Sequence, residues 1–262
     1  MASEGGDGLR RGLLPVPGRG TAPSPPQYRR VGEGGLLVEF ANEISPEVNR
    51  RVRTLLAALD ATPPPGLLDL IPAYRTLLVL YDPLRLTDDQ LITHLASLKL
   101  EEASAPPART VTIPVIYGGE YGPDLDAVAA HCGLTPEEVI VRHSSAIYLV
   151  YFIGFSPGYP YLGGLDPALH TPRLTQPRLV VPAGTVAIGG QQTGIYPQAT
   201  PGGWRLIGRT PTRLYDPTAS EPFLLRPGDE VRLRPIGAKE YAAILAKNVT
   251  AAVSHEGADG DC

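Results

Sequence analysis

The sequence has little cysteine and no long apolar run, and both shortages exclude classes of protein. Of its 262 residues only two are cysteines, Cys132 and Cys262. Two cysteines that form no CxxC pair cannot build a disulfide framework, which favours a reduced, cytoplasmic protein. No stretch of about 18 apolar residues occurs, so no transmembrane helix is predicted. Prolines interrupt the short apolar segment around Leu13 and Leu14, which excludes a secretory signal.

The sequence also lacks a strong charge of either sign, with a net charge of −4 at pH 7. A small negative charge argues against a general binder of nucleic acid or of anionic membranes. Glycine and proline, by contrast, are abundant, at 29 residues each. Their combined share lies well above the usual value of about 12%. Because no collagen period is present, this abundance indicates many turns and loops.

Apolar residues in the first half predict a small domain over residues 28–100. Helical spacing begins after Ser45, with Pro46 at the first helical position. A second helix begins at Thr87, where Gln90 completes a capping box. Four runs predict strands, at residues 28–31, 36–40, 67–71 and 76–81. The predicted order is therefore ββαββα, in the α+β class.

Residues 110–253 predict a second domain, in which strands dominate. Residues 101–109 have the composition of a linker, and residues 1–27 and 254–262 are expected to be a disordered leader and tail. Helices are predicted at 124–131, 135–144 and 241–246, and a strand at 147–153. Short apolar runs alternate with Gly and Pro turns, at residues 179–181, 186–188, 204–207, 223–225 and 231–233. This alternation favours a β-barrel or sandwich over a parallel α/β sheet.

Two glycine-rich strings resemble catalytic motifs but fail on chemistry. Residues 154–158 match G-x-S-x-G, in which the residue after Ser156 supplies an oxyanion N–H. That residue is Pro157, which has no N–H, so the serine-hydrolase hypothesis is rejected. Residues 189–194 lack the Lys of a phosphate loop, which favours a turn between strands. The amides of Gln191 and Gln192 could still hydrogen-bond a polar ligand.

The histidines give no sign of a metal site. The five of them include no HxxxH or HExxH pair, so no metal is expected. His143 falls at the end of a predicted helix, where the dipole favours a positive imidazole. A structural role and a catalytic role for His143 both stay open at this point.

The densest signal lies between His143 and Arg209, where arginines and aromatics interleave with turn residues. Turns explain most of the Gly and Pro but not this interleaving. Arginines can bind carboxylate or phosphate through two hydrogen bonds, and aromatic side chains can wall a pocket. The alternative is a Gly- and Pro-rich barrel with solvated arginines. The residues expected to wall a pocket are Phe155, Tyr159, Pro201, Gly203 and Trp204.

Four segments in this region resemble the signatures of one protein family. They are residues 139–143 with GFSPGYPYLGGL at 154–165; PR at 172–173 and 177–178 with VPAGTVAI at 181–188; TGIYP at 193–197 with TPGGWRLIGRT at 200–210; and LRPGDEV at 225–231. The chain is similar to the B-subunit family of 5-oxoprolinase. That family is also called allophanate hydrolase subunit 1 or KipI-like, and corresponds to carboxyltransferase subdomains C and D. Tyr159 and Leu233 stand where the family more often has Phe, and neither removes a polar motif residue.

The resemblance implies a small α+β domain followed by a cyclophilin-like β-barrel. It also implies two partners, the C subunit, which is a related barrel protein, and the A subunit, which belongs to the LamB/YcsF family. Together the three subunits would open 5-oxo-L-proline to L-glutamate with ATP. The chain has no nucleotide loop, so ATP is expected to be shared with a partner. On these grounds His143 is the candidate acid/base. Candidate anion and polar binders are Arg173, Arg178, Arg209, Gln191 and Tyr196. Arg209 is also a candidate catalytic residue. We expect the three arginines to meet in one cleft.

Two other functions remain open from the sequence. Some family members resemble an inhibitor of a sensor histidine kinase, which would make the chain a protein-binding regulator. A carboxyltransferase-like role in urea or allophanate metabolism is the second. Met1 is the only methionine, so no Met-Lys-Met biotinyl motif exists and any biotin would come from another protein.

Overall fold

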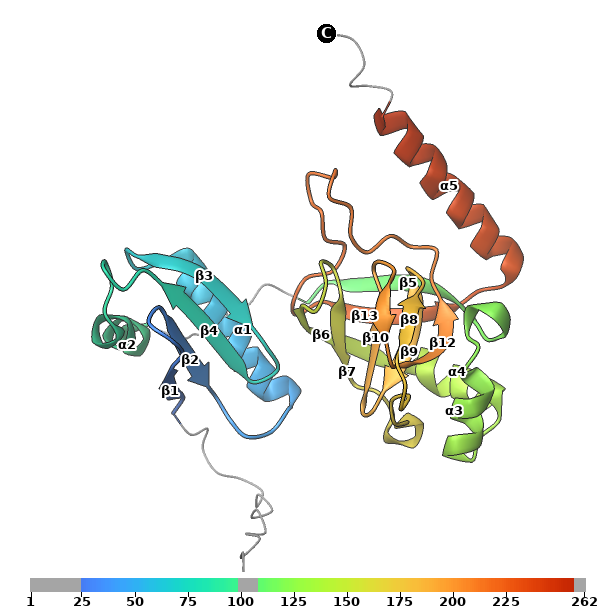
Figure 1. The fold of residues 1–262 in the computed structure, drawn as a ribbon, viewed down its shortest axis with the longest axis horizontal. Coiled ribbons are helices and arrows are strands. Elements are labelled where there is room, and N and C mark those ends of the chain that lie inside the picture. Colours follow the sequence, from blue (N-terminus) through green and yellow to red (C-terminus); the bar gives the residue numbers. More distant parts are fainter. Residues whose placement is uncertain (1–24, 99–107, 257–262) are drawn as a thin grey trace, which may run out of the picture.

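The computed structural model describes residues 25–98 and 108–256. The leader predicted at 1–27 and the linker predicted at 101–109 lie almost wholly outside the described residues, as does most of the predicted tail. Figure 1 shows two parts, a small sheet with its helices and a barrel from which the last helix projects. Within the described ranges, no helix has the length and apolarity needed to cross a membrane.

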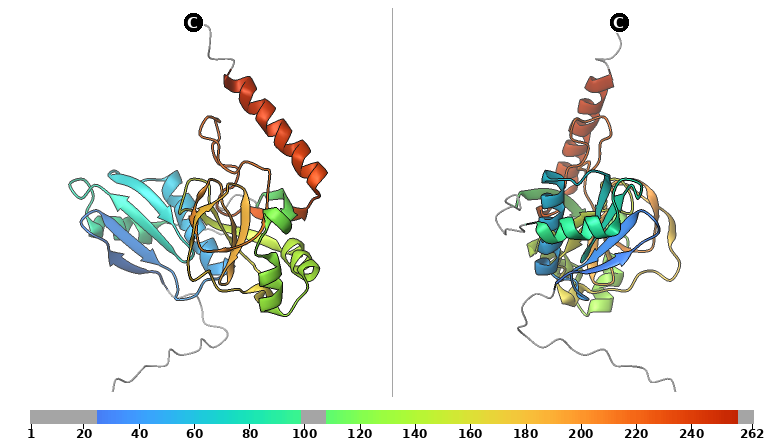
Figure 2. Two further views of the ribbon diagram at one scale, coloured as in Figure 1. Left: turned by 45° about the vertical axis from the view of Figure 1, so that its right-hand side comes forward. Right: turned by 90° about the vertical axis from the view of Figure 1, so that its left-hand side faces the viewer.

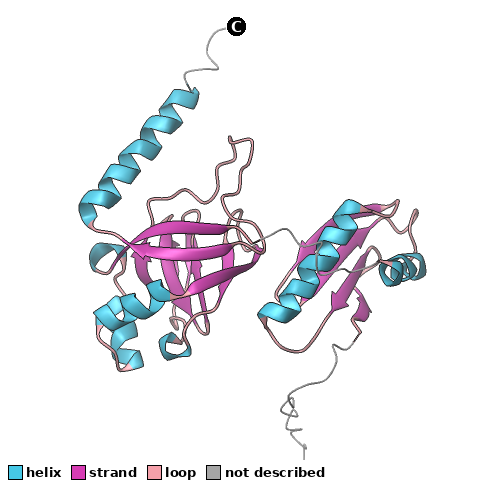
Figure 3. Ribbon diagram, turned by 180° about the vertical axis from the view of Figure 1, so that it is seen from behind, coloured by secondary structure: helices cyan, strands magenta, loops and turns pink. Residues whose placement is uncertain are grey.

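The N-terminal domain is a four-stranded antiparallel sheet in the order β1-β2-β4-β3. Its strands are β1 (Gln27–Arg30), β2 (Gly35–Glu39), β3 (Leu67–Pro72) and β4 (Thr76–Tyr81). Helix α1 (Pro46–Ala61) follows β2, and α2 (Asp88–Ser97) follows β4. The chain order is therefore the predicted ββαββα. Figure 3 shows α1 lying along one face of the sheet.

Both helices begin at the residues that the sequence predicts. The Ser45 side chain accepts a hydrogen bond from the Val48 N–H, and Thr87 and Gln90 form a complete capping box. These side chains satisfy N–H groups that have no partner within the helix. Alternate β4 residues are buried against the apolar face of α1, which makes the core of this domain.

The second domain is a closed barrel of seven strands, which confirms the α+β class and selects a barrel over a sandwich. Around the barrel the strands follow the order β10-β7-β6-β13-β5-β12-β9. They are β5 (Thr110–Tyr117), β6 (Ile147–Ile153), β7 (Pro160–Gly163), β9 (Thr185–Gly189), β10 (Gln192–Ile195), β12 (Arg205–Arg209) and β13 (Glu230–Pro235). Only β13 and β5 pair in parallel among the described strands of the barrel. A separate two-stranded sheet joins β8 (Arg178–Val181) to β11 (Thr200–Gly202).

The strands of the second domain differ from the sequence prediction in two ways. Strands β7, β10 and β11 were not expected, because each is short and contains Gly or Pro, which are rare in strands. The run at 223–225 was expected to be a strand. It makes only an isolated bridge between Phe223 and Tyr215, so that expectation was wrong.

The helices of the second domain lie outside the barrel wall. They are α3 (Leu125–Cys132), α4 (Pro136–Ser145) and α5 (Ala238–Glu256), with short 3₁₀ turns η2 (Gly119–Tyr121) and η3 (Pro167–Leu169). Helix α5 is longer than the predicted 241–246 and runs into the segment expected to be a tail. Residues 238–256 contain no Gly or Pro and many good helix formers, which explains the extension. Figure 2 shows α5 leading away from the barrel in both views.

The two domains meet through Asn49 and Tyr74. The Asn49 amide, fully buried, donates to the carbonyl oxygens of Ala73 and Tyr74 in its own domain and of Tyr151 in the barrel, each at 3.3 Å. The Tyr74 ring packs edge-on against Tyr151 and Phe152, with centroids 5.4 and 4.8 Å away. These contacts place the β3–β4 turn against the outside of β6 and β7.

Candidate functional site

The barrel wall separates two groups of buried side chains. The interior holds a large apolar cluster that includes Val186, Ile188 and Ile195. A second cluster lies on the outer side of β7, β9, β10 and β12, and contains Tyr159, Tyr161, Val181, Ala187, Tyr196, Trp204 and Leu206. Successive residues of a strand point to opposite faces, which explains how Ala187 joins the outer cluster between two interior neighbours. We call this second cluster the outer aromatic face.

Three glycines seat the rings of the outer aromatic face. A Cβ at Gly189 would lie 2.5 Å from the Trp204 ring, one at Gly194 would lie 2.7 Å from the Tyr159 hydroxyl, and one at Gly202 would lie 2.5 Å from the Tyr196 hydroxyl. Any side chain at these positions would displace a buried ring. The glycines are therefore packing residues here, and their abundance in the sequence reflects this as well as turns.

Arg173 is the cationic group on this face. Its guanidinium carbon lies 5.5 Å from the centre of the Trp204 ring, and the side chain is exposed with no ion pair among the described residues. Its backbone is held on both sides, because Thr171 pairs with Gly190 and the Leu174 N–H donates to the Gly203 oxygen at 2.7 Å. A cation held over an indole and lacking a carboxylate partner is positioned to bind an anion.

The tyrosine hydroxyls around Arg173 stay protonated at neutral pH. Burial raises the pKa of Tyr159, Tyr161 and Tyr196, and the positive charge of Arg173 opposes that rise. The Tyr196 hydroxyl also hydrogen-bonds with the backbone N–H of Trp204, which fixes the ring that supports Arg173. The site therefore combines one cation with neutral O–H donors.

The N-terminal domain extends this face through Tyr74. The Tyr74 ring centroid lies 5.8 Å from that of Tyr161, and its hydroxyl accepts a hydrogen bond from the Gln192 amide of β10. Burial raises the pKa of Tyr74, with a smaller opposing effect of Arg173. Nothing local in the sequence indicates Tyr74, because it comes from the other domain.

Arg178 reaches the same tryptophan but is already paired. Its guanidinium donates to the Asp124 carboxylate at 2.7 Å and to the Trp204 carbonyl oxygen at 3.4 Å. The second oxygen of Asp124 accepts from the Leu206 N–H, also at 2.7 Å. Arg178 thus ties β8 to the start of α3 and to β12. Its charge is compensated within the chain, which favours a structural role over anion binding.

Arg209 does not join the other two arginines. Trp204 directly precedes β12 and Arg209 is its last residue, which separates their backbones by roughly 16 Å at about 3.3 Å per residue. The Arg209 guanidinium instead lies 5.7 Å from the Tyr121 ring centre and beside Tyr241 of α5. Its Nε is buried without a hydrogen-bond partner. The expectation that all three arginines converge on one cleft is therefore corrected. Arg173 and Arg178 both lie at Trp204, and of these two only Arg173 has no ion pair among the described residues.

The His143 side chain reaches from α4 into the barrel interior and does not lie on the outer aromatic face. Its Nδ1 contacts the Tyr117 hydroxyl of β5 at 2.9 Å, and its Nε2 contacts the Thr193 hydroxyl of β10 at 2.8 Å. The residue is fully buried, and burial lowers its pKa to about 3. The positive imidazole expected from the helix dipole is thus disfavoured. Two hydroxyl partners and the barrel wall between His143 and Arg173 point to a structural role.

This burial predicts a pH-dependent stability. An unfolded histidine takes up a proton near pH 6.5, whereas folded His143 does so only near pH 3. Above pH 6.5 the burial of His143 should therefore leave the free energy of unfolding independent of pH. Below pH 6.5 that free energy should fall by up to about 1.4 kcal/mol per pH unit. Urea denaturation at pH 7, 6 and 5 measures this slope. His143→Asn should flatten it, whereas the exposed His131→Asn should not; equal slopes in the two variants would contradict the assignment.

The remaining predicted site residues fall around the edge of the face. Gln191 is exposed at the tip of the β9–β10 hairpin, Pro201 is exposed on β11, and Gly203 anchors the Arg173 segment. Phe155 is 66% exposed, with its ring 5.4 Å from that of Tyr159. Its φ of 64° is the one positive value at a non-glycine residue in the described chain. That strained turn leads into β7 and not into a helix, in line with the rejected nucleophile motif.

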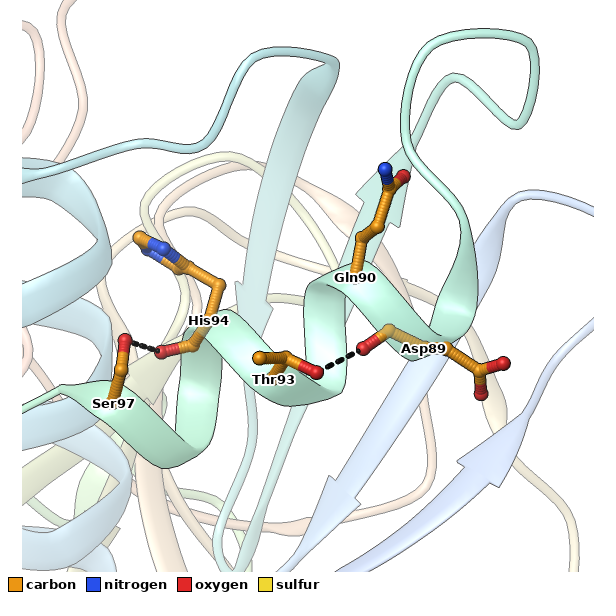
Figure 4. A pocket seen from close by; sticks show the side chains of 5 residues that line it. All are labelled: Asp89, Gln90, Thr93, His94 and Ser97. Atoms are coloured by element: carbon orange, nitrogen blue, oxygen red, sulfur yellow. Dashed lines mark hydrogen bonds between the residues drawn. The ribbon is translucent and has the colours of Figure 1, made fainter.

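Two surface depressions lie elsewhere. One of about 410 Å³ is lined by residues of α2 alone, and Figure 4 shows the hydroxyls of Thr93 and Ser97 bonded to carbonyl oxygens of the same helix. Another of about 780 Å³ lies between Asp69 and the segment around Phe223. Neither contains a predicted site residue. Across the described ranges, no three His, Cys, Asp or Glu side chains are grouped to hold a metal ion.

Comparison with known proteins gives consistent relatives. The family model of the carboxyltransferase domain, subdomain C and D, matches residues 26–225. The 5-oxoprolinase B subunit of Escherichia coli O157:H7 is 46% identical over 206 residues, covering 78% of this chain and 94% of that protein. The 5-oxoprolinase B subunit of Bacillus subtilis is 42% identical over 229 residues, covering 83% of this chain and 95% of that protein.

A solved structure shares the fold. The protein titled TTHA0988 superposes with a TM-score of 0.71 at 46% sequence identity, covering 78% of this chain. The match accounts for 40% of that protein, so this chain corresponds to only part of the longer one. The two-part architecture described above is therefore shared with an experimentally determined structure.

Proposed function

Because the chain belongs to the family of the carboxyltransferase domain, subdomain C and D, and its relatives are oxoprolinase subunits, we propose that it serves as the B subunit of a 5-oxoprolinase. Identity of 42–46% over nearly the whole length of two such subunits supports this function. The proposed reaction is the ATP-dependent opening of 5-oxo-L-proline to L-glutamate.

The observation that carries the proposal at the level of chemistry is the unpaired Arg173 over Trp204. 5-Oxo-L-proline is a small ring that bears one carboxylate. A guanidinium can bind that carboxylate through two hydrogen bonds, and Arg173 is exposed where it is held over the Trp204 ring. Burial raises the pKa of the described tyrosines of this face, so they stay protonated at neutral pH. The part that the proposal assigns to this chain is substrate binding.

ATP and the chemical step require other subunits in this proposal. The glycine-rich residues 189–194 form a tight hairpin between β9 and β10, with Thr193 turned into the barrel, and do not fit a phosphate-binding loop. We expect partners of the A and C types to supply the nucleotide site and the hydrolytic groups.

The test is reconstitution. Coexpression with candidate A and C subunits should yield a complex that forms glutamate from 5-oxo-L-proline only when ATP is present. The chain alone should form none. A folded complex of all three subunits with no turnover would contradict the proposed function.

The two alternatives have less support. A regulator of a sensor histidine kinase needs no cation held over an indole. A carboxyltransferase role fits the family's name, yet the relatives matching 94–95% of their own length are called oxoprolinase subunits. Kinase autophosphorylation measured with and without this protein tests the first alternative, and carboxylation of urea by the reconstituted complex tests the second.

A further inference from the structure

The hairpin of β9 and β10 fixes which glutamine faces the site. Gln192 pairs directly with Gly189 across the two antiparallel strands, so both positions point to the same side of the sheet. That side carries the Trp204 ring, which lies against Gly189, and Gly194 two residues on from Gln192 accommodates Tyr159. Gln192 therefore belongs to the outer aromatic face. Its neighbour Gln191, which the sequence favoured, lies in the turn and is exposed.

Gln192 and Arg173 lie on the same patch of this face. Arg173 stands over the Trp204 ring, and the Trp204 ring covers Gly189, the direct cross-strand neighbour of Gln192. Tyr74, which contacts Gln192, is also close enough to Arg173 to interact with its charge. A cation and a carboxamide therefore both lie near the same indole.

The Gln192 carboxamide is held in place by the other domain. Its Nε2 donates to the Tyr74 hydroxyl, and Tyr74 is wedged among Tyr151, Phe152 and Tyr161. This bond uses one of the two N–H groups. The second N–H and Oε1 have no partner among the described contacts, and Gln192 is half-buried. One donor and one acceptor of a preoriented amide therefore remain free for a ligand.

The free groups match a cyclic amide. A five-membered lactam ring forces its amide into the cis form, so its N–H and C=O point to the same side. A carboxamide offers the complementary pair, an oxygen for the lactam N–H and an N–H for the lactam oxygen. A site that holds a cation beside such an amide selects ligands that carry both a carboxylate and a cyclic amide.

From this geometry we propose that Gln192 is the specificity-determining residue that recognises the amide of the substrate, and that Tyr74 is the positioning residue that orients it. Arg173 binds the carboxylate of the same molecule. This inference rests on the proposed function for the choice of 5-oxo-L-proline as the ligand, and goes beyond it by naming the groups that read the lactam.

Isothermal titration calorimetry on the full chain tests it with three compounds. 5-Oxo-L-proline has both groups, L-proline has the carboxylate without the lactam, and 2-pyrrolidinone has the lactam without the carboxylate. The wild type should bind 5-oxo-L-proline at least tenfold more tightly than either of the others. Gln192→Glu should weaken that binding at least tenfold and remove the preference over L-proline.

Matched variants separate recognition from charge and from folding. Gln198→Glu makes the same charge change at an exposed residue in a bend and should leave all three affinities unchanged. Tyr74→Phe keeps the ring packing but removes the hydroxyl, so it should weaken the binding of 5-oxo-L-proline and leave the binding of L-proline unchanged. Gln192→Ala provides a neutral second variant, and circular dichroism melts show that each variant is folded.

The outcomes distinguish this inference from the proposed function. Equal effects of Gln192→Glu and Gln198→Glu, or no saturable binding of 5-oxo-L-proline to the wild type, overturn the inference. A reconstituted complex without turnover, while binding stays dependent on Gln192, overturns the proposed function alone. An active complex whose KM is insensitive to Gln192→Glu overturns the inference alone.

Discussion

Replacing Arg173 by alanine is expected to raise the KM of the reconstituted complex for 5-oxo-L-proline by about 10- to 140-fold with little change in kcat. Arg173 is the unpaired guanidinium of the outer aromatic face, and hydrogen bonds to charged groups contribute roughly 1.5–3 kcal/mol. The carboxylate of the substrate does not react, so the loss falls on ground state and transition state alike. Steady-state kinetics at saturating ATP measures both constants.

Two variants make this result interpretable. Arg173→Lys keeps the charge but loses the planar pair of donors, so its KM should fall between those of the wild type and of Arg173→Ala. Arg232 is exposed on β13 with no ion pair among the described contacts, and Arg232→Ala should leave KM unchanged. An Arg173→Ala complex with the KM of the wild type would show that the carboxylate binds elsewhere.

Asp124→Ala is expected to produce the largest loss of stability, about 2–4 kcal/mol in the free energy of unfolding. The Asp124 carboxylate is buried and accepts from both Arg178 and the Leu206 N–H. Its removal leaves a buried N–H without a partner and a half-buried cation uncompensated. The lower part of the usual range for buried pairs applies, because the Arg178 side chain is 30% exposed to solvent.

The control for this variant lies two residues along the chain. Asp126 is exposed in the first turn of α3, and Asp126→Ala should change stability by no more than about 0.5 kcal/mol. Asp124→Asn keeps an acceptor for the Leu206 N–H, so its free energy of unfolding should lie between those of the two alanine variants. Urea denaturation followed by Trp204 emission reports on the barrel. Equal midpoints for Asp124→Ala and Asp126→Ala would contradict the role given to Asp124.

Local signals predicted the secondary structure well wherever the cause of an element is itself local. The capping residues Ser45 and Thr87 each accept the expected hydrogen bond, because a cap involves only side chains and N–H groups within one turn. Strands β7 and β10 were missed because their glycines are needed to seat rings from other segments. That requirement is tertiary and leaves no local pattern.

The site was predicted in part, for a related reason. Arg173, Tyr159, Tyr196 and Trp204 were chosen together from their density, and the fold brings them to one face. Arg209 was grouped with them by its charge and motif position, which ignores that a strand of five residues carries its two ends far apart.

The pairing partners were the hardest residues to foresee. Asp124 neutralises Arg178 from 54 residues away, and Tyr74 reaches Gln192 from 118 residues away. A single sequence contains no signal for such contacts. The sequence did contain a signal for the choice between Gln191 and Gln192. Once the hairpin turn is placed at Gly190, strand alternation assigns each following residue to one face of the sheet.

The emission of Trp204 tests the central claim most directly, because it is the only tryptophan in the chain and forms the centre of the outer aromatic face. Adding 5-oxo-L-proline to the full chain should change this emission saturably, with half-saturation at the Kd from calorimetry, and Arg173→Ala should abolish the change at the same concentrations. Calorimetric binding of 5-oxo-L-proline without any change in Trp204 emission would place the ligand elsewhere and contradict the account.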